Sequence, residues 1–77
     1  MDTTEIIKDI ISRQTDIDKE SLSENTTIED ITNDSLDIVE MLMEIEEAFD
    51  IDISDEDAEK LTTFGELCRY IETRLNS

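Results

Sequence analysis

The residue with the clearest chemical potential is Ser35, in the stretch Asp34-Ser35-Leu36-Asp37. Asp34 is a typical N-cap residue, whose carboxylate accepts from backbone N–H groups in the first turn of a helix. Asp37 lies three residues later and could reach back to complete a capping box. Ser35 would then be the first helical residue, with its hydroxyl directed off the helix end. An isolated Asp-Ser pair is ordinary capping chemistry, and a serine without a base is a poor nucleophile.

The remaining residues offer little chemistry of their own. The 77 residues contain no histidine, one glycine and one cysteine, so a zinc ligand cluster, a glycine-rich phosphate loop and an intramolecular disulfide are excluded. Cys68 falls at helical spacing between Phe64 and Ile71, which indicates a small apolar core residue. We therefore expect neither enzyme activity nor a metal site.

The composition is strongly acidic, with 23 Asp and Glu residues against 6 Lys and Arg and a formal net charge of -17. No basic residue occurs between Lys19 and Lys60. Phosphate groups would repel such a chain, so nucleic acids and anionic membranes are excluded as partners and basic protein surfaces are favoured. High charge with few aromatic residues is also typical of disorder, but the regular apolar spacing described below argues against it.

The N-terminal stretch has no basic segment and no long apolar run, so we predict neither a signal peptide nor a transmembrane span. We expect a cytoplasmic, monomeric protein. A length of 77 residues with 36% hydrophobic content allows one modest core. We therefore expect a single domain over residues 1–77.

Helical periodicity and the absence of proline predict an all-α fold. We expect a small four-helix bundle, with three longer helices, one short helix and a long loop between the first two. The first helix is predicted over residues 3–14, capped by Asp2 with Glu5 as its capping-box partner. Its buried stripe is expected to comprise Ile6, Ile7, Ile10 and Ile11. The loop over residues 15–33 should be held against the core by Ile17, Leu22, Ile28 and Ile31.

The second helix is predicted to start at Ser35 and to carry two apolar rows. The row expected to face the core comprises Ile38, Leu42, Ile45 and Phe49. The other row comprises Leu36, Val39 and Met43 and is flanked by the acids Asp37, Glu40, Glu44 and Glu47. This row is either the margin of a wide buried stripe or an exposed apolar strip rimmed by charge, which would mark a partner site.

Two further helices are predicted in the C-terminal third. Ser54 should cap a short helix with Asp57 as its partner, and the core contacts of that helix should be Ala58 and Leu61. Thr63 should cap the last helix together with Glu66. The inner face of the last helix should comprise Phe64, Leu67, Cys68, Ile71 and Leu75.

About half of the chain resembles the acyl carrier proteins of fatty acid synthesis. The resemblance is carried by Asp34-Ser35-Leu36-Asp37, Val39-Glu40, Met43, Glu46-Glu47, Phe49-Asp50, Ile53 and the segment 55–63. It implies that a separate Mg-dependent transferase attaches 4'-phosphopantetheine from coenzyme A to Ser35, and that the arm carries acyl chains as thioesters. It also favours the exposed strip, which would dock on basic patches of the transferase and the acyl-processing enzymes. The implied partner-binding residues are Asp34, Leu36, Asp37, Val39, Glu40, Met43, Glu46 and Glu47.

The sequence departs from this family just before the serine. The family usually has a Leu-Gly pair and a small or apolar residue, where this chain has Ile31, Thr32 and Asn33. A positive φ would strain a threonine, so a different local backbone is expected at Thr32. Two alternatives stay open: a specialised carrier of polyketide, aminoacyl or other acyl cargo, and an unmodified acidic interaction module.

Overall fold

The computed structural model describes residues 2–76, and within that range it is built from helices and their connections without strands. The elements in chain order are α1 (Thr3–Thr15), the 3₁₀ helix η1 (Lys19–Ser21), α2 (Ile28–Ile31), α3 (Ser35–Phe49), α4 (Asp55–Lys60) and α5 (Phe64–Leu75). The four predicted helices are confirmed. The predicted long loop is also present, but it contains η1 and the four-residue helix α2, which the periodicity analysis did not predict.

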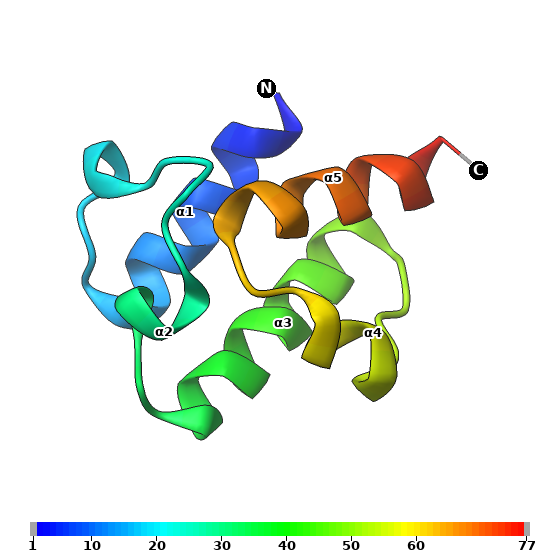
Figure 1. The fold of residues 1–77 in the computed structure, drawn as a ribbon. Coiled ribbons are helices and arrows are strands. Elements are labelled where there is room, and N and C mark those ends of the chain that lie inside the picture. The colour runs from blue at the N-terminus through cyan, green and yellow to red at the C-terminus, as the bar shows by residue number, and fades with distance from the viewer. Residues whose placement is uncertain (1, 77) are drawn as a thin grey trace.

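The helices surround one apolar core. Helix α1 packs against both α3 and α5. Figure 1 shows both ends of the chain at one end of the molecule and the start of α3 at the opposite end, with α4 beside α3. The buried hydrophobic residues are Ile7, Ile10, Ile11, Leu22, Ile31, Met41, Ile45, Phe64, Leu67, Cys68 and Ile71. The arrangement leaves the first turn of α3 far from the chain ends.

Each longer helix begins at a residue whose side chain accepts from the backbone. Asp2 accepts from the N–H of Thr4 at 3.0 Å, and Thr63 accepts from the N–H of Glu66 at 3.2 Å. The Glu66 carboxylate in turn accepts from the hydroxyls of Thr62 and Thr63. The contacts of Asp2 and Thr63 confirm these two predicted N-caps, because each satisfies a backbone N–H that lacks a partner within its helix.

The long connection before α3 is held as predicted. Leu22 and Ile31 are buried in the core, and Ile17 and Ile28 pack against it while partly buried. The connection also pairs with the segment before α5 through an antiparallel bridge between Thr27 and Thr63. These contacts order a long segment that has little regular structure of its own.

The buried side of α3 differs from the prediction. Ile45 is fully buried as expected, but the other fully buried residue is Met41, which the analysis assigned to neither row. Ile38, Leu42 and Phe49 are only partly buried. The buried residues of α3 are therefore Met41 and Ile45, one turn apart, and both belong to the core that α1 and α5 share with α3.

The inner face of α5 was predicted correctly except at its end. Phe64, Leu67, Cys68 and Ile71 are buried, whereas Leu75 is 41% exposed. Leu75 is the last residue of α5, one turn beyond the final buried position, where no core residue lies next to it in sequence. Burial raises the pKa of the Cys68 thiol to about 11, which supports an inert core residue rather than a nucleophile.

Candidate functional site

Ser35 is the first residue of α3 and is exposed. Asp34 precedes it as the N-cap, and its carboxylate accepts from the N–H of Leu36 at 3.0 Å. Within residues 2–76 no hydrogen bond engages the Ser35 hydroxyl, so that oxygen is available to a reagent from solvent. The predicted placement of the serine at the helix start is therefore confirmed.

The predicted capping box between Asp34 and Asp37 is wrong. The N–H of Asp34 donates to the hydroxyl of Thr32 at 3.1 Å, rather than to the Asp37 carboxylate. The same hydroxyl donates to Asp37 at 3.3 Å. Thr32 therefore lies between the two acids and takes the role that the capping box gave to Asp37, because its side chain can both accept and donate.

The backbone at Thr32 shows no strain. Its φ is -159° and its ψ is 147°, an extended conformation that any residue adopts. The positive φ values of non-glycine residues in the described part of the chain occur at Asp16 and Asp50, which end α1 and α3. Thr32 therefore occupies its position without the strain that a positive φ would cause.

An exposed apolar strip runs down α3 from Ser35. Leu36, Val39 and Met43 are 63%, 51% and 53% exposed. The N-cap Asp34 and the acids Glu40 and Glu47 of the same helix are also exposed, and Asp37 is partly buried against Thr32. Of the two interpretations of this row, the buried margin is wrong and the charged, exposed strip is present.

Glu46 departs from the other residues of the predicted partner surface. Its side chain is partly buried, and its carboxylate accepts from the N–H of Ile53 at 3.0 Å. This contact holds the connection between α3 and α4. Glu44, expected at the edge of the strip, is likewise partly buried. We therefore limit the candidate partner surface to the exposed acids and the apolar strip.

A groove with a volume of about 760 Å³ opens beside Ser35, between α3 and α4. Its apolar lining consists of Ile28, Ile38, Val39, Leu42, Ala58 and Leu61, and its polar lining of Thr27, Glu29, Ser35, Asp55, Glu59 and Thr62. A small void of about 20 Å³ lies among Ile28, Ile38, Leu42, Ala58 and Leu61 of the same lining, with Met41 and Leu67 from the core. A mostly apolar concavity of this size suits a small-molecule ligand.

The groove was not predicted from the sequence. Ile38 and Leu42 were expected in the core because their spacing follows a helical stripe. Spacing shows that two residues share a face, but not which neighbour covers that face. Here the neighbour is α4, a six-residue helix with no buried residue of its own, so the face stays partly open.

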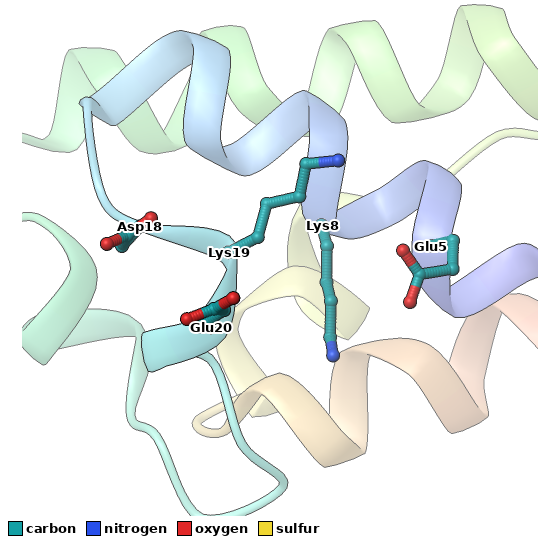
Figure 2. Close-up of a pocket in the computed structure, with 5 residues that line it drawn as sticks. All are labelled: Glu5, Lys8, Asp18, Lys19 and Glu20. Atoms are coloured by element: carbon teal, nitrogen blue, oxygen red, sulfur yellow. The ribbon is translucent and has the colours of Figure 1, made fainter.

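A second depression lies between α1 and η1 and does not resemble a reactive site. Its volume is about 410 Å³, and it is lined by Glu5, Lys8, Asp18, Lys19 and Glu20. Figure 2 shows the side chains of Lys8 and Lys19 extending in opposite directions. Lys19 forms an ion pair with Asp9, whose hydrogen bond and charge raise the pKa of Lys19. All five lining residues carry charges, of both signs, and this mixture gives the depression no evident ligand.

No group of three or more acidic or cysteine side chains within residues 2–76 is placed to hold a metal ion. In the same part of the chain, no helix has the length and apolar character needed to cross a bilayer.

Comparison with known proteins connects this geometry to a family. A family profile described as "Phosphopantetheine attachment site" matches residues 5–71. The chain belongs to the acyl carrier protein family. The acyl carrier protein of Wolinella succinogenes is 46% identical over 68 residues, covering 87% of this chain and 90% of that protein. The acyl carrier protein of Chlamydia felis is 48% identical over 69 residues, covering 88% of each.

A solved structure shows the same fold. It is that of the acyl carrier protein from Enterococcus faecalis, described as having novel structural components that contribute to its high thermal stability. The TM-score is 0.79 and the identity 36%, with 94% of this chain and 92% of that chain covered.

Membership of the acyl carrier protein family defines the general role of the protein. The protein carries acyl groups in fatty acid synthesis, uses a covalently attached phosphopantetheine group, and is a carrier rather than a catalyst. It interacts with modifying and acyl-processing enzymes. The alternative of an unmodified acidic interaction module is therefore not supported.

Proposed function

We propose that Ser35 is the attachment residue and that it receives 4'-phosphopantetheine from coenzyme A through a separate transferase. The observation that carries this proposal is an exposed serine hydroxyl, free of hydrogen bonds within residues 2–76, at the start of α3 and at the edge of the groove. The hydroxyl oxygen would form a phosphodiester as the pyrophosphate bond of coenzyme A breaks and adenosine bisphosphate leaves.

The local electrostatics suit a phosphate at this position. Helix α3 has 15 residues, and its N-terminus carries unsatisfied N–H groups and a partial positive charge that favour an anion. Asp34 already caps one N–H group, and its charge opposes a phosphate. Asp37 is engaged by Thr32. We infer that the two carboxylates serve recognition by the transferase more than attachment itself.

The groove is proposed to shelter the acyl chain. When bound, the phosphopantetheine arm would supply a flexible thiol that holds the acyl group as a thioester. Ser35 lines the same groove as Ile38, Leu42 and Leu61, so a chain tethered at Ser35 is next to an apolar lining. Each methylene removed from water contributes about 0.8 kcal/mol. Longer chains should therefore gain more from the groove until its volume is filled.

The exposed strip of α3 is proposed as the docking surface for partner enzymes. Leu36, Val39 and Met43 offer apolar contact, and Glu40 and Glu47 beside them offer negative charge. A chain with a net charge of -17 will be attracted to basic surfaces. We propose that basic patches of the transferase and the acyl-processing enzymes meet α3 here. The cytoplasmic location, the monomeric state and the single domain over residues 1–77 remain predictions.

The attachment residue can be tested by intact mass. Apo-protein incubated with coenzyme A and a phosphopantetheinyl transferase should gain the mass of one phosphopantetheine, and Ser35→Ala should gain nothing. Ser21→Ala removes another exposed hydroxyl, in η1, and should be modified like the wild type. Modification of Ser35→Ala would overturn the assignment of Ser35.

A further inference from the structure

Helix α4 forms one side of the groove but is weakly embedded in the core. Asp55, Ala58 and Glu59 line the groove from this helix. None of its six residues is buried, and Ala58 is only partly so. Apolar burial therefore contributes little to holding α4 in place, and its position must depend on other contacts.

The segments on both sides of α4 are tied to the body of the molecule by hydrogen bonds. Before the helix, Glu46 accepts from the N–H of Ile53, and Arg74 donates to the carbonyl of Asp52 at 3.0 Å. After the helix, two backbone hydrogen bonds link the chain to the segment around the start of α2. The N–H of Ile28 donates to the carbonyl of Thr62 at 2.9 Å, and the N–H of Phe64 donates to the carbonyl of Thr26 at 2.8 Å. The ends of α4 are therefore fixed.

The helix itself is joined to α5 by one side-chain hydrogen bond. The hydroxyl of Tyr70 donates to the carboxylate of Asp57 at 2.8 Å, and both side chains are partly buried. Within residues 2–76 this is the one side-chain hydrogen bond between α4 and another helix. Burial and the bond to Asp57 raise the pKa of Tyr70, so its hydroxyl keeps the proton that it donates.

We propose that Tyr70 is a positioning residue of the carrier, which holds α4 through Asp57 and thereby sets the width of the groove between α3 and α4. The consequence, which rests on the proposed function of the groove, is that the Tyr70–Asp57 contact limits the length of acyl chain that can be sheltered. Tyr70 does not line the groove and would act only through α4.

Amide hydrogen exchange of the apo-protein tests the positioning role without any cargo. The N–H groups of Ala58 and Leu61 are bonded to Ser54 and Ala58, so they report on opening of α4. In Tyr70→Phe their exchange should be faster by about twofold to tenfold, since one hydrogen bond is lost. The amide of Ile10 in α1 should accelerate by no more than this factor, because it exchanges only when the core opens. Unchanged exchange at Ala58 and Leu61 would overturn the proposal.

Matched variants separate this contact from general destabilisation. Ser12→Ala removes a hydrogen bond to the Asp9 carbonyl within α1 and should leave α4 exchange unchanged. Asp57→Asn keeps a carbonyl acceptor and should retain most of the protection that Asp57→Ala loses. In the Asp57→Ala background, Tyr70→Phe should have no further effect, because the two side chains act as a pair. Additive effects would contradict the pairing.

Thioester stability tests the consequence for cargo. Holo-protein loaded with saturated acyl groups from butyryl to palmitoyl is exposed to hydroxylamine, and thioester cleavage is followed by mass. In the wild type, cleavage should slow with chain length until the groove is filled, and in Tyr70→Phe this slowing should extend to longer chains. Cleavage independent of length in the wild type would overturn the groove function. Length dependence that is identical in the variant would overturn only the role of Tyr70.

Discussion

At the scale of single residues, an exposed serine hydroxyl at the start of a long helix suits attachment of a phosphate-linked arm. Sequence motifs located Ser35 and its cap Asp34 correctly, because capping depends on a few neighbouring residues. The same motifs predicted the wrong hydrogen-bond partner for Asp37. The Thr32 hydroxyl lies within hydrogen-bond distance of Asp37 because the backbone at Thr32 is extended, and the preceding residue Ile31 is held in the core.

Cys68 gives a prediction at this scale. Burial raises the pKa of its thiol to about 11, so the reactive thiolate is scarce in the folded protein at neutral pH. Alkylation by iodoacetamide should be slow in native buffer and fast in urea, as followed by intact mass. Fast alkylation in native buffer would show that this part of α5 opens readily.

The same shift makes the stability of the fold depend on pH. The pKa of Cys68 is higher in the folded state than its ordinary value of 9.0, so folding favours the neutral thiol. This contribution is fully present below pH 9.0 and is lost as the pH rises through about 11. The urea midpoint of the wild type should therefore fall more steeply above pH 9.0 than that of Cys68→Ala.

At the scale of elements, α3 presents different faces to the core, the groove and the solvent. Periodicity predicted the exposed row of Leu36, Val39 and Met43 but could not separate the core from the groove. That separation depends on α4, whose short length leaves Ile38 and Leu42 partly open. The part of the site that was missed depends on how α4 packs beside α3, which the periodicity of a single helix does not describe.

Reversing two charges on α3 tests the docking surface. In Glu40→Lys/Glu47→Lys, binding to a basic partner enzyme should weaken by about tenfold or more, mainly through a slower on-rate with reduced salt dependence. Folding should be retained because both side chains are exposed. The measurement is surface plasmon resonance at several salt concentrations.

A matched control has the same change in net charge elsewhere. Glu20→Lys/Glu72→Lys reverses two exposed acids on η1 and α5 and should weaken binding much less. Equal losses in the two double variants would show that net charge, rather than the α3 surface, governs docking. Unfolding of the first variant would show that Glu40 and Glu47 are structural.

Gly65 tests how closely the start of α5 packs against the loop at Glu24. A Cβ atom at this position would lie 2.9 Å from the carbonyl oxygen and 3.2 Å from the Cα of Glu24, and backbone atoms cannot move aside cheaply. Alanine gains up to about 1 kcal/mol of helix propensity, but overpacking typically costs about 1–3 kcal/mol. Gly65→Ala should therefore lower the free energy of unfolding in urea. An unchanged or raised stability would show that the loop at Glu24 shifts freely.

At the scale of the whole molecule, like charge opposes a small core. Sixteen acids and no base occur between Glu20 and Glu59. Pairs such as Glu40 and Glu44 repel by a few tenths of a kcal/mol each, and a small domain has only about 5 kcal/mol of stability in total.

The fold class was predictable because apolar spacing and caps recur in every helix. Helix α2 could not be predicted, because its four residues are too few to show a helical repeat of apolar positions.

Salt should therefore stabilise the protein. At 0.1 M salt, the repulsion between exposed charges more than about 10 Å apart is largely screened. If this lowers the total repulsion in the folded state by about 1 kcal/mol, Tm should rise by about 4–8 °C. Thermal melting in NaCl should show this rise. Glu40→Gln/Glu47→Gln, which removes two of the repelling charges, should melt higher at low salt and respond less to NaCl. A Tm that is flat or falls with salt would mean that repulsion does not limit the fold.

The central claim is that Ser35 carries the acyl group of this protein through a phosphopantetheine arm. The most direct measurement is the intact mass of protein purified after co-expression with a phosphopantetheinyl transferase, before and after hydroxylamine. The wild type should show the mass of the arm plus an acyl group, and hydroxylamine should remove only the acyl part, whereas Ser35→Ala should show the mass of the bare chain throughout. A wild type without the arm, or a Ser35→Ala variant that carries it, would contradict this account.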